Sequence, residues 1–217
     1  MAAVRQVHLV RHGEVDNPQG VLYGRLPGYH LSALGQRMAQ AAADELAGRR
    51  RSLAALIASP LTRTQESAAP IAAAFSIGIG TDERVVEPGN RFEGTVMARA
   101  ARNPLNWPWL INPLRPSWGE AYSSIARRMS DAVTDAFAQP WLSADEAGDV
   151  VIVSHQLPIW IEHLTVVGGG YVHDPRHRRC TLSSITTFEQ RGMRLFEVGY
   201  ADPAAPLAES AVDVGAV

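Results

Sequence analysis

The chain has 217 residues, of which 46% are hydrophobic and 19% are charged, and its formal net charge is −2. The length favours one large domain, the composition excludes a disordered chain, and the weak charge gives no reason to expect a nucleic acid partner. All 20 basic residues are arginine, which excludes chemistry that needs a lysine, such as a Schiff base or a Walker-type phosphate loop. Positive charge that recognises a ligand must then come from guanidinium groups, which suit phosphate or carboxylate.

Neither a membrane segment nor a disulfide is expected. No apolar run reaches the length of a transmembrane helix, and Arg11 and His12 interrupt the N-terminal run too early for a signal peptide. The single cysteine, Cys180, cannot form a disulfide within the chain. We therefore expect a cytoplasmic protein with no membrane partner.

The first half of the chain alternates short apolar runs with helical patterns. Residues 7–10 form a mostly apolar run that predicts a buried strand. A helix is predicted over residues 32–48, because it begins with a serine suited to an N-cap and its apolar residues share one face. The apolar run 53–58 predicts a second strand, and Ser59 and Pro60 predict the cap and first residue of the next helix.

The middle of the chain is less regular. A strand followed by a loop is predicted over residues 85–94. Residues 88–117 are rich in proline, asparagine and tryptophan, and we interpret them as a lid inserted into the domain. A helix over residues 120–138 and a strongly β-branched strand over residues 150–153 follow.

The C-terminal part combines one helix, two strands and a tail. The helix is predicted over residues 158–167, where a run of glycines ends it, and the strands over residues 181–188 and 193–198. Residues 201–217 are small, acidic and proline-containing, and they predict a disordered tail. The folded domain is therefore expected to span residues 1–200.

Strands that alternate with helices predict an α/β domain with a mostly parallel sheet. In such sheets ligands bind at the carboxyl ends of the strands, so the polar residues at those ends are the candidate site. Two arginines, two histidines and one carboxylate follow the predicted strands: Arg11, His12, Arg63, Glu87 and His155.

These residue types together suit phosphoryl transfer. Two guanidinium groups and a helix N-terminus would bind a phosphoryl group. A neutral imidazole can attack phosphorus, and a second, protonated imidazole can donate to the phosphoryl oxygens as charge builds. A carboxylic acid can protonate the leaving oxygen and then, as a carboxylate, deprotonate water. None of these steps requires a metal or a cofactor.

Four segments, in this order, carry a resemblance to a known family: Val7–Glu14, Leu31–Gly35, Ala58–Ala68 and Val150–His155. Together they resemble the signature segments of the histidine phosphatase superfamily, which includes the cofactor-dependent phosphoglycerate mutases. The likeness extends over roughly residues 5–200. It implies a three-layer sandwich in which helices flank a mostly parallel central sheet.

The resemblance also implies roles for the residues at the strand ends. His12 would be the nucleophile that becomes phosphorylated, while Arg11, Arg63 and His155 would hold the phosphoryl group. Glu87 would be the proton donor, because its surroundings fit the family's donor segment with one residue fewer between its two parts.

Two assignments differ from the family's pattern. Asp82, Glu83 and Glu93 remain alternatives to Glu87 as the proton donor. Asn17 is predicted to contact the phosphate, although it lies one position earlier than the family's asparagine.

The loops are expected to select the substrate. Four residues are predicted to face the leaving group: Arg25, Tyr29, Arg91 and Gln156. A further arginine cluster, Arg176, Arg178 and Arg179, could reach a second phosphate or an acidic substrate, or could have a structural role. The run Arg49–Arg51 at a helix end is interpreted as solvated.

A metal site is not expected. His163, His173 and His177 are candidate ligands, but Pro175 interrupts the last pair and prevents the helical spacing of a zinc site. The sequence thus predicts a phosphomonoesterase that needs no metal or cofactor and acts through a phosphohistidine on a small phosphorylated metabolite. A phosphoglycerate mutase-type reaction and a non-catalytic phospho-ligand-binding module remain alternatives, and a homodimer through a sheet edge is compatible with the sequence.

Overall fold

The computed structural model describes residues 5–110, 119–138 and 148–211, and a six-stranded sheet lies at its centre. The order across the sheet is β3-β2-β4-β1-β5-β6. Neighbours among the first four strands in this order are parallel, and β5 and β6 add an antiparallel edge. The strands are β1 (Gln6–Arg11), β2 (Leu53–Ala58), β3 (Ile79–Thr81), β4 (Asp149–Ser154), β5 (Ile185–Arg191) and β6 (Arg194–Ala201).

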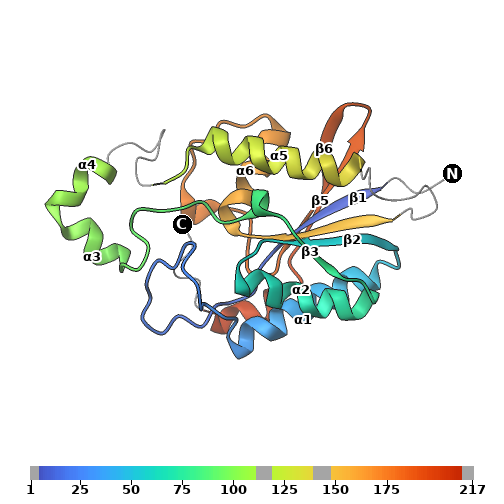
Figure 1. The fold of residues 1–217 in the computed structure, drawn as a ribbon, viewed down its shortest axis with the longest axis horizontal. Coiled ribbons are helices and arrows are strands. Elements are labelled where there is room, and N and C mark those ends of the chain that lie inside the picture. The colour runs from blue at the N-terminus through green and yellow to red at the C-terminus, as the bar shows by residue number, and fades with distance from the viewer. Residues whose placement is uncertain (1–4, 111–118, 139–147, 212–217) are drawn as a thin grey trace.

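Helices cover both faces of the sheet, as Figure 1 shows. One face carries α1 and α2, and the other carries α5 and α6, while α3 and α4 lie beyond one end of the sheet. The helices are α1 (Ala33–Gly48), α2 (Thr62–Phe75), α3 (Met97–Arg102), α4 (Trp107–Leu110), α5 (Tyr122–Ala138) and α6 (Gln156–Val167). The predicted three-layer sandwich is confirmed.

The central strand β4 shows why the sheet is covered twice. All six of its residues are buried. Val150 and Ile152 pack in the core beneath α5 and α6, whereas Val151 and Val153 pack in the core beneath α1 and α2. A β-branched run that is apolar at every position is buried on both faces, because successive side chains point to opposite sides.

The helix after β2 begins later than predicted. Its first residue is Thr62 and its N-cap is Leu61, so the prediction that Ser59 caps it and Pro60 opens it is wrong. Ser59 is instead drawn into a tertiary contact, since its hydroxyl lies 2.9 Å from the ring of His155. Arg63 still lies in the first turn, as predicted.

The strand predicted around Glu87 is also wrong. The chain forms the short strand β3 earlier, and a 3₁₀ turn over Glu83–Val85 leads into Glu87. The Asp82 side chain caps this turn by accepting a hydrogen bond from the backbone N–H of Arg84. The β-branched residues that predicted a strand are buried, but their backbone follows this local cap.

The C-terminal elements are shifted along the chain. Helix α6 begins at Gln156, with Pro158 in its first turn, where a missing N–H costs no intrahelical bond. Strand β6 ends at Ala201 and a 3₁₀ helix follows over Ala205–Ser210, so the folded part extends beyond the predicted boundary at residue 200. Ala204 is buried in a small core cluster. The rest of the predicted tail, residues 212–217, lies outside the described residues.

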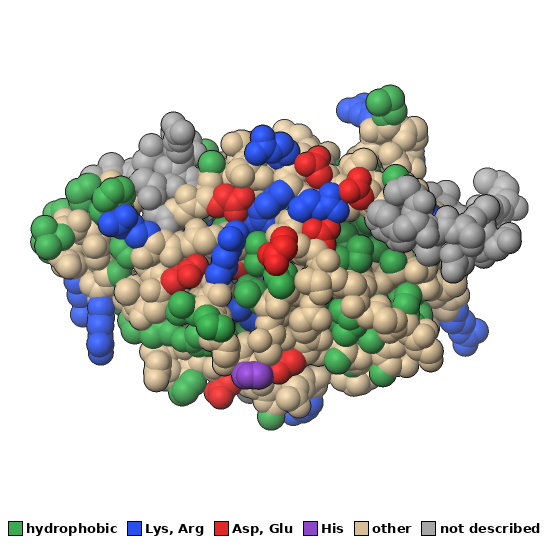
Figure 2. Space-filling view, in the orientation of Figure 1, with side chains coloured by type: hydrophobic (Ala, Val, Ile, Leu, Met, Phe, Trp, Pro, Cys, Tyr) green, Lys and Arg blue, Asp and Glu red, His purple; other side chains and the backbone are tan. Residues whose placement is uncertain are grey.

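The predicted lid, residues 88–117, is partly helical. It contains α3, a 3₁₀ turn over Pro104–Asn106 and α4, and residues 111–118 lie outside the description. Leu105 and Trp107 are exposed, and hydrophobic side chains gather at this end of the molecule in Figure 2.

In the described residues, no helix is long and apolar enough to cross a membrane.

Candidate active site

His12 follows β1 directly and is almost completely buried. Its Nδ1 atom lies 2.8 Å from the backbone carbonyl oxygen of Gly13. A carbonyl oxygen only accepts, so Nδ1 carries the proton and Nε2 keeps a lone pair. Burial, together with the charges of Arg63 and Arg11, lowers the pKa of His12 well below its usual value. The ring is therefore a neutral imidazole with a nucleophilic nitrogen.

His155 follows β4 and lies beside His12, which follows β1. It also contacts Ser59, which follows β2. The two rings have their centroids 5.2 Å apart and meet edge to face. The Nε2 atom of His155 lies 2.9 Å from the Ser59 hydroxyl, and Nδ1 lies 3.3 Å from Nη2 of Arg63. Burial, Arg63 and His12 lower the pKa of His155 well below its usual value, so this ring is also neutral.

Two guanidinium groups are buried beside the histidines. Arg11 donates a 2.7 Å hydrogen bond to the carbonyl of Cys180, and Arg63 donates one of the same length to the carbonyl of Gly24. The guanidinium of Arg63 also lies over the ring of Tyr23, 4.7 Å from its centroid. Buried cations that also depress the pKa of neighbouring histidines create a strongly electropositive site that suits an anion.

Glu87 completes the cluster. Its side chain is buried, and its Oε2 atom lies 3.4 Å from Nδ1 of His155. The preceding turn is held against β4, because the Ser154 hydroxyl donates a 2.7 Å bond to the carbonyl of Val85. Burial raises the pKa of Glu87, and the charges of nearby arginines, Arg63 first among them, oppose that rise.

Two buried atoms of the cluster point to a ligand. Within the described residues, Nε of Arg63 and Oε1 of Glu87 have no hydrogen-bond partner. A buried polar atom without a partner is costly, and active sites are a common reason for keeping one. A phosphoryl oxygen would satisfy the donor, and the proton of a leaving or attacking oxygen would satisfy the acceptor.

The three alternative proton donors have other surroundings. Asp82 forms an ion pair with Arg84 that is 2.7 Å long, and Glu83 is exposed. Glu93 accepts hydrogen bonds from the backbone N–H groups of Arg25 and Asn90 and so anchors a loop. Among the four carboxylates considered, Glu87 is the one that contacts a histidine of the cluster.

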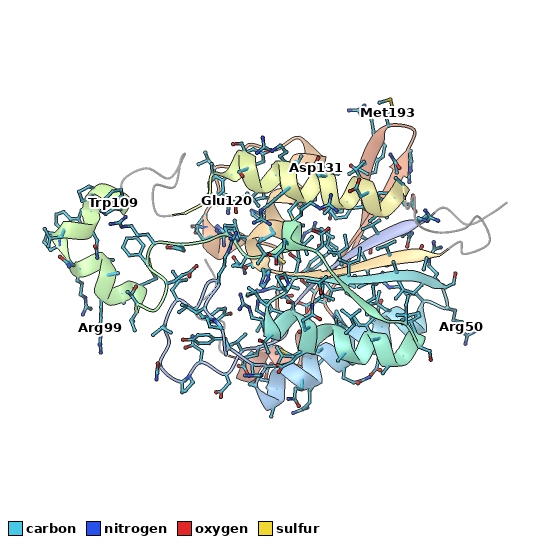
Figure 3. All side chains as sticks on the ribbon, viewed as in Figure 1. Arg50, Arg99, Trp109, Glu120, Asp131 and Met193 are labelled. Atoms are coloured by element: carbon cyan, nitrogen blue, oxygen red, sulfur yellow. The ribbon has the colours of Figure 1, made fainter. Side chains whose placement is uncertain are left out.

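The predicted substrate residues divide into two groups. Arg25 donates from Nε to the backbone carbonyl of Glu87, and its guanidinium lies 3.6 Å from the carboxylate of Glu120, which is labelled in Figure 3. Tyr29 packs against Tyr23, the ring beneath Arg63. Both residues therefore border the cluster.

Two other predicted residues make contacts away from the histidines. The Asn17 amide exchanges hydrogen bonds with the backbone of Val21, and its phosphate contact stays a prediction. Arg91 lies over the ring of Trp109, 4.2 Å from its centroid, and is thereby directed toward α4.

Two residues near the cluster were predicted differently from the sequence: Ser59 as a helix cap, and Arg178 as one of three arginines that either reach an acidic substrate or have a structural role. The Ser59 hydroxyl bonds His155, although its position before a proline suggested a helix cap. Arg178 is nearly buried and bonds Gln156, the residue that follows His155. The position of Ser59 at the end of a strand is the feature of the sequence that indicates a place in the site. No feature of the sequence distinguishes Arg178 from the neighbouring arginines.

The histidines considered as metal ligands have other neighbours. His163 pairs with Glu197, and His173 bonds the carbonyl of Tyr171 at 2.7 Å. Across residues 5–110, 119–138 and 148–211, no group of three or more histidine, cysteine or acidic side chains could hold a metal ion.

Known proteins resemble this chain over most of its length. The histidine phosphatase superfamily (branch 1) matches residues 7–202. The uncharacterized protein Rv0525 of Mycobacterium tuberculosis is 50% identical over 203 residues, which cover 92% of this chain and 97% of that protein. A 2,3-bisphosphoglycerate-dependent phosphoglycerate mutase of Thermoplasma acidophilum is 29% identical over 70% of each chain.

A solved structure shares the fold. A phosphoserine phosphatase of Entamoeba histolytica, solved with phosphoserine, superposes with a TM-score of 0.73 at 20% identity and covers 92% of this chain and 98% of that one. The match to the family spans the two histidines, the two arginines and Glu87. The chain therefore belongs to the histidine phosphatase superfamily.

Proposed function

We propose that this protein is a phosphomonoesterase that needs no metal and forms a phosphohistidine at His12. The observation that carries the proposal is the meeting of two neutral histidines with two buried guanidinium groups, Arg11 and Arg63. Attack on a phosphate anion requires an uncharged nucleophile. It also requires cations that are held in fixed positions around the phosphate.

The first step forms the bond from His12 Nε2 to phosphorus and breaks the bond from phosphorus to the ester oxygen. The hydrogen bond from Nδ1 to Gly13 holds the ring in the tautomer that exposes Nε2. Glu87, whose pKa is raised by burial so that its protonated form is favoured, gives its proton to the departing alcohol.

The second step reverses these roles with water. The Glu87 carboxylate takes a proton from water, the water oxygen bonds to phosphorus, and the bond to His12 breaks to release inorganic phosphate. Arg11 and Arg63 offset the charge on the phosphoryl oxygens in both steps. A bound dianion also raises the pKa of His155, which then donates to an equatorial oxygen.

The substrate class we propose is a small phosphorylated metabolite. Membership in the phosphatase superfamily supports hydrolysis as the reaction class. The mutase among the relatives supports a second candidate, in which the phosphoryl group returns to another hydroxyl of the substrate. Isomerisation of 3-phosphoglycerate faster than its hydrolysis, in a coupled assay, would establish the mutase instead.

Replacement of the nucleophile tests the proposal directly. His12→Ala is expected to lower the hydrolysis of a chromogenic phosphate ester by a factor on the order of 10³ or more, because the variant lacks the imidazole on which the covalent intermediate forms. Wild-type protein given a phosphodonor should acquire an acid-labile phosphate that His12→Ala does not acquire.

The control for this test is His177→Ala, since the His177 side chain is 82% exposed. It should retain full activity and labelling. Hydrolysis that survives in His12→Ala would rule out the mechanism. A wild-type protein that binds phosphate but is never labelled and never turns over would instead be a binding module.

A further inference from the structure

Arg178 lies in the segment between α6 and β5, and its guanidinium is held from two sides. Its Nε atom donates a 2.9 Å hydrogen bond to Nε2 of His173, and Nη1 donates a 3.2 Å bond to Oε1 of Gln156. Nδ1 of His173 in turn donates to the carbonyl of Tyr171, so Nε2 is the nitrogen that can accept. These contacts fix both the plane and the direction of the guanidinium.

The same contacts place Arg178 against the active site. Gln156 follows His155, and its amide nitrogen lies 3.4 Å from the carbonyl of Cys180, to which Arg11 also donates. Arg178 interacts electrostatically with Glu87 and, more weakly, with Arg11. It is therefore a third buried cation, on the side of the site where Glu87 lies.

That side is where the alcohol part of the substrate must sit. Glu87 delivers its proton to the ester oxygen, so the carbon chain attached to this oxygen extends past Glu87. In the proposed mechanism the phosphoryl group is held by Arg11, Arg63 and the histidines. Arg178, which lies near Glu87 and Gln156, is then the buried cation left to meet the leaving group.

A permanent cation beside a proton donor needs an explanation. After Arg63, Arg178 is the next largest charge that favours the ionised form of Glu87, which is the wrong form for the first step. An anionic group on the substrate, bound to Arg178, would offset that charge only when substrate is present. A planar guanidinium of fixed orientation suits a carboxylate, which it can contact through two parallel hydrogen bonds.

We propose that Arg178 binds a carboxylate on the alcohol part of the substrate, so that the preferred substrates are phosphate esters of small hydroxy acids. The proposal rests on the proposed function for the position of the leaving group. It assigns Arg178 to specificity, with His173 and Gln156 as positioning residues.

The test compares two ligands that differ in one carboxylate. Phosphoserine and phosphoethanolamine share the phosphate and the ammonium group, and phosphoethanolamine lacks the carboxylate. Both are titrated by calorimetry into His12→Ala protein, which does not consume them. We expect phosphoserine to bind roughly 10- to 100-fold more tightly, as a charge-assisted bidentate contact allows.

The variant His12→Ala/Arg178→Gln should bind both ligands with about the same affinity, through a selective loss of phosphoserine binding. Arg179→Gln in the same background is the matched control, because the Arg179 side chain is 45% exposed and pairs with Glu197 at the surface. It should preserve the preference.

Four outcomes would overturn the proposal. The first is an equal affinity of the two ligands for His12→Ala protein, and the second is an equal loss of affinity for both ligands on Arg178→Gln. The third is a loss of the phosphoserine preference on Arg179→Gln that equals the loss on Arg178→Gln, and the fourth is an absence of binding for both ligands. Failure of the proposed function is distinguishable, because it removes turnover and labelling in wild-type protein and leaves this binding ratio measurable.

Discussion

At the scale of single residues, the proposed mechanism makes Glu87 the group that sets how activity depends on pH. Burial raises its pKa, so it stays protonated to higher pH than an exposed glutamate does. The first step needs the protonated form, and kcat for an ester with a poor leaving group should therefore fall as pH rises through this raised pKa. A pH profile of kcat for an alkyl phosphate tests this expectation.

Glu87→Gln should lower kcat for the same substrate by about 10²–10⁴-fold and remove this alkaline decline, because an amide cannot donate the proton. Glu83→Gln is the matched control, since Glu83 is exposed and adjacent in the sequence. If Glu87→Gln kept full activity with an unchanged profile, the proton donor would have to be another group.

At the scale of elements, the interface between α6 and α5 contains a buried acid. Glu162 has no exposed surface, and Ser130 of α5 donates a 2.8 Å hydrogen bond to its Oε2 atom. Burial raises the pKa of Glu162 to about 7. The neutral acid is therefore the form that suits the interface between the two helices.

This raised pKa predicts a loss of stability at high pH. A folded-state pKa above the unfolded value gives stability that is complete below about pH 4.5 and is lost as pH rises through about 7. The loss amounts to about 3 kcal/mol in the free energy of unfolding, at about 1.4 kcal/mol per pKa unit. Urea unfolding at pH 5 and pH 8 measures it.

Glu162→Gln should reduce this difference between the two pH values, and Glu83→Gln should leave it unchanged. Replacing the acid by an amide of similar shape removes the ionisation and keeps a polar partner for Ser130. An undiminished pH dependence in Glu162→Gln would show that other groups cause it.

At the scale of the whole molecule, the two ends of the sheet carry different groups of polar residues. The candidate catalytic cluster lies at the carboxyl ends of β1, β2 and β4. At the opposite end, Asp149 lies 3.3 Å from Nε2 of His8, accepts a hydrogen bond from the backbone N–H of Gln6 and forms an ion pair with Arg51. The arginine run at the end of α1, expected to be solvated, thus contributes Arg51 to a structural ion pair.

The Asp149 carboxylate should stabilise the fold without affecting catalysis. Arg51, His8 and the Gln6 N–H lower its pKa, so its contribution is present at neutral pH and is lost as pH falls. Asp149→Asn should lower the free energy of unfolding by about 1–3 kcal/mol, because it leaves Arg51, whose side chain is 30% exposed, without its counter-charge and weakens the acceptor for His8 and the Gln6 N–H. The measurement is urea unfolding at pH 7.

A measurement of activity shows whether residues at one end of the sheet affect catalysis at the other end. Asp149→Asn protein that remains folded should keep kcat within about 3-fold of the wild type. Asp131→Asn, at the exposed position on α5 labelled in Figure 3, should change neither property. A large fall in kcat at full folding would show that the two ends are coupled.

Local patterns predicted much of this molecule. The apolar runs of β1, β2 and β4 are visible in the sequence, and β4 shows the reason most clearly, because a strand buried on both faces is apolar at nearly every position. The residues that follow these strands could be named in advance, since parallel strands bring their carboxyl ends together. Glu87 was named as well, although the element before it is a 3₁₀ turn and not a strand.

The sequence by itself determined the layered α/β fold and four of the residues in the cluster: Arg11, His12, Arg63 and His155. Only the tertiary structure decided that Ser59 bonds His155, that Glu87 rather than its neighbours meets that histidine, and that Arg178 borders the site. Strand and helix periodicity is a property of adjacent residues, whereas these contacts join segments up to 96 positions apart in the chain. Such contacts depend on the order of the strands and the paths of the loops, which no local pattern encodes.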